Sequence, residues 1–143
     1  QAPPASPRKR RERKLTPPIF RPGACLSVHL PNGHFGAALV LSAGEEHETF
    51  GKNLIGILAY RSVTKPSISV FEKRKWLKTK RHIFFRRKEL LWLLAQGFAD
   101  SSNMFENVGQ VKLRWLDPHK TKVSASNWRI IPTIIQKSLP EAI

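Results

Sequence analysis

The segment between residues 73 and 88 combines cationic and aromatic side chains in a way that suits binding to a polyanion. Only Glu72 and Glu89, which border the segment, carry negative charge. A solvated helix face or loop usually mixes charges of both signs, whereas phosphates are bound by cations that have no acidic partner. We therefore predict phosphate contacts through nine cations: Lys73, Arg74, Lys75, Lys78, Lys80, Arg81, Arg86, Arg87 and Lys88.

Aromatic residues lie among these cations, and two interpretations of them stay open. Proteins that bind single strands stack unpaired bases on aromatic rings, which makes Trp76 and Phe85 candidate stacking residues. Large aromatic side chains also dominate hydrophobic cores, so burial is the competing interpretation for Trp76, Phe84 and Phe85.

A second basic run lies near the start of the chain, where Pro residues are frequent. Its six cations fall within seven residues, and they are Arg8, Lys9, Arg10, Arg11, Arg13 and Lys14. Because proline fixes φ and removes a hydrogen-bond donor, residues 1–22 are predicted to form an extended, solvated arm. Block charge of this kind is typical of tails that bind nucleic acid, although a solubilising tail or a nuclear-import signal has the same composition.

Residue types that perform catalysis or bind metals are present but scattered. The five histidines show no HxH or HxxxH spacing, and Cys25 is the single cysteine, so neither a metal site nor a disulfide is expected. The acidic residues Glu45, Glu46 and Glu48 share one loop and resemble a solvated loop more than a shielded acid–base pair. We find no Gly-rich phosphate loop with a terminal Lys-Ser or Lys-Thr. The sequence thus predicts no enzyme and no cofactor.

The whole chain is strongly basic, with 25 Lys and Arg against 10 Asp and Glu and a formal net charge of +15 over 143 residues. Such an excess disfavours a compact state unless a polyanion neutralises it, which favours a nucleic acid, or else an anionic protein or membrane surface, as partner. The longest apolar stretch, Leu90–Ala95, is too short to cross a bilayer. We expect a soluble protein of the cytoplasm, in the nucleoid or a nucleoprotein complex, or of the nucleus in a eukaryote.

The elements that position the basic segment begin with a β-hairpin. Alternating apolar residues in 26–30 predict one strand, and the apolar run 35–41 predicts the strand that returns beside it. The Asn-Gly pair in Pro31–His34 predicts the tight turn between them. The apolar run 53–60 predicts a third, central strand. A meander of this kind closes most economically into a small, strongly bent SH3-like or OB-like barrel. Residues 23–143 are therefore predicted to form one β-rich domain.

The rest of the chain gives weaker signals. Residues 68–76 fit a short helix with Ser67 as its N-cap, or a strand, and residues 89–97 favour a short buried helix. Alternation in 111–115 predicts a strand, 128–131 a last short strand, and 132–139 a turn or helix. The predicted class is mainly β (α+β), with one or two short helices.

Residues 21–115 resemble the bacterial toxin-immunity proteins of immunity protein family twenty-six. The matching stretches are Pro22–Leu30 with the turn Asn32–Gly36, then Leu39–Leu41, and then Lys65–Ser67 after the third strand. This resemblance implies a compact β-rich fold and, in some members, tight binding that blocks a toxin. It implies no particular functional residue in this chain.

Together these patterns predict a non-enzymatic nucleic-acid-binding accessory protein, a subunit of a larger nucleoprotein assembly. The alternative is an immunity-type or adaptor module that binds and blocks an acidic protein through a groove or a strand edge. A weaker third interpretation is attachment to an anionic membrane surface by the basic residues.

Overall fold

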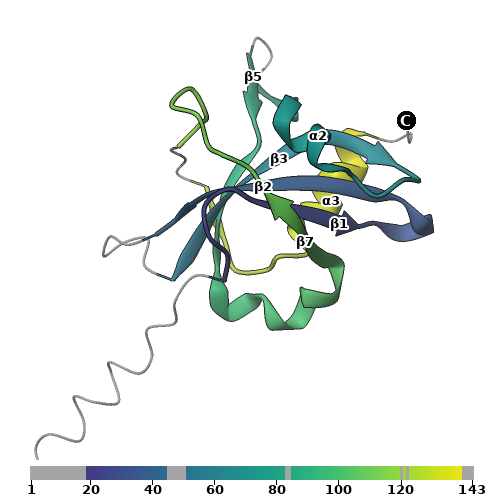
Figure 1. Ribbon diagram of the computed structural model, residues 1–143, viewed down its shortest axis with the longest axis horizontal. Coiled ribbons are helices and arrows are strands. Elements are labelled where there is room, and N and C mark those ends of the chain that lie inside the picture. Colours follow the sequence, from purple (N-terminus) through teal and green to yellow (C-terminus); the bar gives the residue numbers. More distant parts are fainter. Residues whose placement is uncertain (1–18, 45–50, 83–84, 120, 122, 140–143) are drawn as a thin grey trace, which may run out of the picture.

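The computed structural model describes residues 19–44, 51–82, 85–119, 121 and 123–139 (Figure 1). For residues 79–82, 85–87 and 96 it describes the backbone alone. The predicted phosphate contacts from Arg8 to Lys14 lie outside these ranges.

A six-stranded sheet forms the centre of the domain, with the strand order β7-β1-β2-β3-β6-β8. Neighbouring strands are antiparallel except for β8, which runs parallel to β6. The mainly β class is confirmed, but the predicted barrel is wrong because β7 and β8 remain as separate edges of an open sheet. The strands are β1 (Ala24–His29), β2 (Phe35–Ala43), β3 (Lys52–Ser62), β6 (Leu90–Leu94), β7 (Phe105–Gln110) and β8 (Ser124–Ala125).

The predicted hairpin is present as β1 and β2, joined by a 3-10 turn at Pro31–Gly33. Asn32 and Gly33 both have positive φ, at 65° and 75°, which is the left-handed conformation that Asn and Gly adopt most readily. The third strand also forms as predicted and is longer at both ends. The local turn signal was sufficient here because the turn needs no distant contact.

Both faces of the sheet are buried against helices. Along β1, Ala24, Leu26 and Val28 belong to one core cluster, whereas Cys25 belongs to the other. The first cluster is covered by α3 (Ile130–Ser138), and the second by α2 (Ile68–Lys73) (Figure 1). Residues of the central strands therefore meet apolar neighbours on both faces of the sheet.

Trp128 is the largest fully buried side chain, and it organises the first cluster. Its ring lies 5.0 Å from that of Phe98 and 5.6 Å from that of Phe105, measured between centroids. Its indole Nε1 donates a hydrogen bond to the Leu94 carbonyl at 2.8 Å. Phe20 packs on the same ring at 6.0 Å, so the packed part of the chain extends upstream of the predicted boundary at residue 23.

The prediction of a buried helix at 89–97 is wrong. Residues 90–94 form strand β6, and a 3-10 helix, Ala95–Gly97, follows it. Leu91 and Leu93 face one core cluster and Leu90 faces the other, so the run is apolar throughout because both of its sides are buried. A short strand in this environment has no polar alternation that separates it from a helix.

Two predicted strands near the C-terminal end are also wrong. Residues 111–114 have no regular structure, and the strand that pairs with β1 lies earlier, as β7, after a 3-10 helix at Ala99–Met104. Residues 128–131 lead into α3, which begins at Ile130 and confirms the helical option for 132–139. Alternation over three or four residues is too short to distinguish these structures.

The helical option for residues 68–76 is confirmed as α2, which ends at Lys73. Arg74 follows in the left-handed conformation, with a φ of 49°, and its backbone N–H donates to the Val70 carbonyl. Ser67 occupies the N-cap position with an extended backbone, although its side chain makes no capping hydrogen bond. In the part of the chain that the structure describes, no helix combines the length and the apolar character needed to cross a membrane.

Replacing Trp128 should strongly destabilise the domain. We expect Trp128→Ala to lower the free energy of unfolding by about 3–5 kcal/mol, because it leaves a large cavity and an unpaired Leu94 carbonyl. Trp128→Phe should lower it by a smaller amount. Urea denaturation followed by circular dichroism measures both, with Trp115→Ala as the control because that indole is exposed. Equal stability of the Trp128 and Trp115 variants would contradict the role given to Trp128.

Candidate nucleic-acid interface

The predicted basic segment folds as the end of α2, a short link and a β-hairpin of β4 (Lys78–His82) and β5 (Phe85–Lys88). The register of this hairpin places Lys78 opposite Lys88, and Lys80 opposite Arg86. Residues directly opposite in an antiparallel pair have Cβ atoms only about 5 Å apart, and like charges there repel. The fold thus concentrates positive charge in a way that an anionic ligand would stabilise.

The base of this hairpin is fixed to the sheet through backbone hydrogen bonds. Leu77 N–H donates to the Ile57 carbonyl at 2.9 Å, and Ile57 N–H donates to the Glu89 carbonyl at 3.0 Å. Glu89 N–H in turn donates to the Leu77 carbonyl at 2.9 Å. Because these bonds tie both ends of the hairpin to one residue of β3, Lys78 and Lys88 leave the sheet at a defined point.

Four predicted phosphate contacts have described side chains that are exposed: Lys73, Lys75, Lys78 and Lys88. The two ion pairs recorded among the described side chains are Lys65–Glu106 and Arg74–Asp117, and neither includes these four lysines. The remaining cations of the segment, Lys80, Arg81, Arg86 and Arg87, are placed by their backbone in β4 and β5. We call the four exposed lysines and the β4–β5 hairpin the basic surface.

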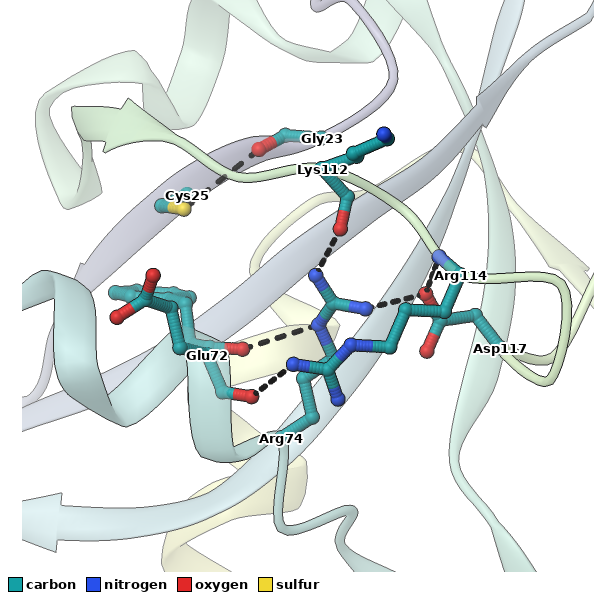
Figure 2. Close-up of polar contacts among 8 residues, drawn as sticks. Gly23, Cys25, Glu72, Arg74, Lys112, Arg114 and Asp117 are labelled. Carbon is teal, nitrogen blue, oxygen red and sulfur yellow. Dashed lines mark hydrogen bonds and ion pairs between the residues drawn. The ribbon is translucent and has the colours of Figure 1, made fainter.

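Arg74 does not belong to the basic surface, which corrects its prediction as a phosphate contact. Its side chain is 3% exposed, and Nη1 lies 2.5 Å from Oδ2 of Asp117 (Figure 2). Nε donates to the Phe71 carbonyl at 3.1 Å, and Nη2 donates to the Lys112 carbonyl. A guanidinium whose charge and donors are already matched inside the protein is not available to a phosphate.

The two predicted stacking residues differ in what the structure describes. Trp76 is half-buried against the second core cluster, and Gly56 leaves room for its ring, because an added Cβ would lie 2.5 Å from Trp76 Cζ3. The Lys88 ammonium lies 6.0 Å from the centroid of that ring. Phe85 stands in β5 opposite His82, and its side chain lies outside the described atoms. Stacking on either residue stays a prediction.

Sequence reasoning assigned no site residue to the segment that follows β7, which lies beside the basic surface. Lys112 and Arg114 are exposed there, and Trp115 is 88% exposed rather than part of an inward strand face. Arg114 Nη2 donates to the Glu72 carbonyl at 2.8 Å, which joins this segment to the end of α2 (Figure 2). The available signal was the Asp117-Pro118 pair, which is typical of a turn rather than of a strand.

Cys25 lies beneath this region and has no catalytic features. Burial raises the pKa of its thiol to about 11, an effect that nearby Arg74 partly offsets and Glu72 slightly reinforces. Its Sγ donates a weak hydrogen bond to the Gly23 carbonyl at 3.6 Å (Figure 2). Among the residues with described positions, no group of three or more His, Cys, Asp and Glu side chains is arranged to hold a metal ion.

Comparison with known proteins identifies no relative. A scan against models of protein families, a search of curated proteins and a search of solved structures each found no match to this chain. The resemblance to the immunity family therefore stays a prediction from short motifs.

Removing the buried guanidinium should be far more damaging than removing an exposed one. We expect Arg74→Met to lower the free energy of unfolding by about 3 kcal/mol or more, because the Asp117 carboxylate would stay largely buried without its partner. Arg114→Met should lower it by about 1 kcal/mol or less, since that side chain is exposed. Urea titrations of the two variants give the comparison, and similar losses for both would refute the structural role of Arg74.

The buried thiol should be chemically protected in the folded protein. At pH 8, below its pKa of about 11, Cys25 is almost wholly protonated and its sulfur is covered. We expect slow labelling by an aromatic disulfide reagent in buffer and rapid labelling in urea, measured by absorbance. Rapid labelling in buffer would show that the thiol reaches solvent.

Proposed function

We propose that this protein is a non-enzymatic nucleic-acid-binding accessory protein, which acts as a subunit of a larger nucleoprotein assembly. The observation that carries the proposal is the basic surface. Its exposed lysines pair with no carboxylate among the described side chains, and they gather around a hairpin of opposing cations. The net charge of +15 on the whole chain points to the same partner. The cations from Arg8 to Lys14 belong to the proposal on the basis of the sequence.

The mechanism is electrostatic and needs no recognition of base identity. Each lysine that neutralises a phosphate releases a condensed counterion, so the affinity decreases steeply as salt increases. The fixed base of the hairpin favours such contacts, because the strands carrying Lys78 and Lys88 need little ordering on binding. Repulsion between opposing cations is also relieved when phosphates bind near them.

The salt dependence of binding tests this proposal. Fluorescence anisotropy would measure the affinity for single- and double-stranded DNA and RNA between about 50 and about 200 mM salt. We expect the double variant Lys78→Gln, Lys88→Gln to reduce the slope of log affinity against log salt by about 1 to 2, since two phosphate contacts are lost. A shortened chain that starts at Ile19 keeps Phe20 in the core. Its salt slope, compared with that of the full chain, gives the number of phosphate contacts that the basic arm contributes.

The matched control is Lys65→Gln, Lys137→Gln, which removes the same charge from other exposed positions. It should leave the slope nearly unchanged. Equal effects of the two double variants would mean that net charge acts without a defined surface. Negligible affinity for every nucleic acid at low salt would refute the proposal and favour the immunity-type or adaptor module that binds an acidic protein.

A further inference from the structure

A β-turn beside the basic surface presents two large apolar side chains to solvent. Asp117 N–H donates to the Arg114 carbonyl at 2.9 Å, which places Trp115 and Leu116 at the two central positions of the turn. Trp115 is 88% exposed and Leu116 is 71% exposed, among the few large apolar side chains that the described surface leaves open. An indole in this position leaves apolar area in water that a ligand would cover.

The turn is held rigidly from inside the protein. The Asp117 carboxylate accepts a hydrogen bond from the Arg114 N–H at 2.7 Å and pairs with the Arg74 guanidinium (Figure 2). Leu113, immediately before the turn, packs against the second core cluster. Because Arg74 and Asp117 are both largely buried, the turn is anchored to the end of α2, and presenting the indole requires little ordering on binding.

The charges around the turn decide which kind of ligand suits it. Lys112 and Arg114 both precede Trp115 in the sequence, and both are exposed. Arg114 bonds to the carbonyl of Glu72, the residue before Lys73, so the turn adjoins the α2 end of the basic surface. In Figure 1 the loop that contains this turn and the β4–β5 hairpin extend beyond the sheet in the same direction. An exposed aromatic ring next to cations in the chain matches a nucleotide, which has an anionic phosphate and an apolar base face.

We propose that Trp115 stacks on an unpaired base, so that the ligand of this surface is single-stranded nucleic acid, with the Arg74–Asp117 pair positioning the indole. This proposal rests on the proposed function and names its substrate class. Bases in a duplex are stacked on one another and leave no face for the indole, whereas bases in a single strand turn outward readily. Trp115 therefore distinguishes single strands from duplexes, while the lysines bind either.

The decisive variant is Trp115→Ala in the full chain, tested with oligothymidylate, oligouridylate and a DNA duplex. We expect its affinity for the single strands to decrease roughly 5- to 100-fold, while the affinity for the duplex stays within about twofold. The salt slope should be unchanged because no phosphate contact is lost. Trp115→Phe should retain much of the affinity, and Leu116→Ala, an apolar truncation in the same turn, should have little effect.

The positioning role of Asp117 has its own readout. Asp117→Asn also leaves the buried Arg74 guanidinium without its carboxylate, so binding is measured where circular dichroism shows the variant folded. There it should weaken single-strand binding toward the level of Trp115→Ala, with the duplex affinity and the salt slope unchanged. In the Trp115→Ala background Asp117→Asn should cause no further loss of single-strand affinity, because the Arg74–Asp117 pair acts through the indole. An additional loss in that background would overturn the positioning role.

The outcomes separate this inference from the proposed function. Suppose that Trp115→Ala binds all ligands normally while the double variant Lys78→Gln, Lys88→Gln shows a reduced salt slope. The stacking proposal is then wrong and the proposed function stands. Equal losses for single strands and duplex would also overturn stacking. If the unaltered protein binds no nucleic acid, both proposals fail. If Trp115→Ala loses binding to phosphatidylserine vesicles while its affinity for single strands is unchanged, the indole binds a lipid surface and the inference is overturned.

Discussion

One buried cation connects the segments that make up the candidate interface. The Arg74 guanidinium bonds to the end of α2 at Phe71, to the segment after β7 at Lys112, and to the turn at Asp117. Removing a guanidinium from water is costly, and here one carboxylate and two carbonyls compensate for it. This guanidinium thus joins the end of α2 to the turn that carries Trp115.

The position of Arg74 depends in turn on the sheet being buried on both sides. Because α2 covers the second core cluster, its C-terminal end lies over the sheet, and the left-handed conformation of Arg74 redirects the chain toward Trp76 and Leu77. Those two residues meet β3 through the Leu58–Trp76 bridge and the Leu77–Ile57 hydrogen bond. The hairpin therefore extends from a rigid platform, and its cations project from a defined place rather than from a loose loop.

The parts of the structure that the sequence predicted are those that local chemistry determines. The Asn32-Gly33 pair specifies the turn between β1 and β2 because only a few residue types adopt positive φ readily. By contrast, residues 90–94 form a strand because β3 and both core clusters surround them. The local sequence does not indicate those neighbours. The pattern identified a basic segment but not which of its cations is used in folding. Arg74 differs from Lys73 and Lys75 through its distant partners, which are the Asp117 carboxylate, 43 residues away, and the Lys112 carbonyl.

The same long-range contact explains why the exposed tryptophan could not be predicted. The local pattern alternates like one face of a strand at Val111, Leu113 and Trp115. In the structure, however, the Arg74–Asp117 pair holds a turn in which Leu113 packs inward and Trp115 is exposed. One interaction thus removes a cation from the surface and adds an aromatic ring beside the remaining ones. The clustered lysines repel one another in the unbound protein, and a strand of phosphates would relieve that repulsion. A ligand that binds only the folded state also stabilises it, so binding at this surface and the stability of the hairpin are thermodynamically linked.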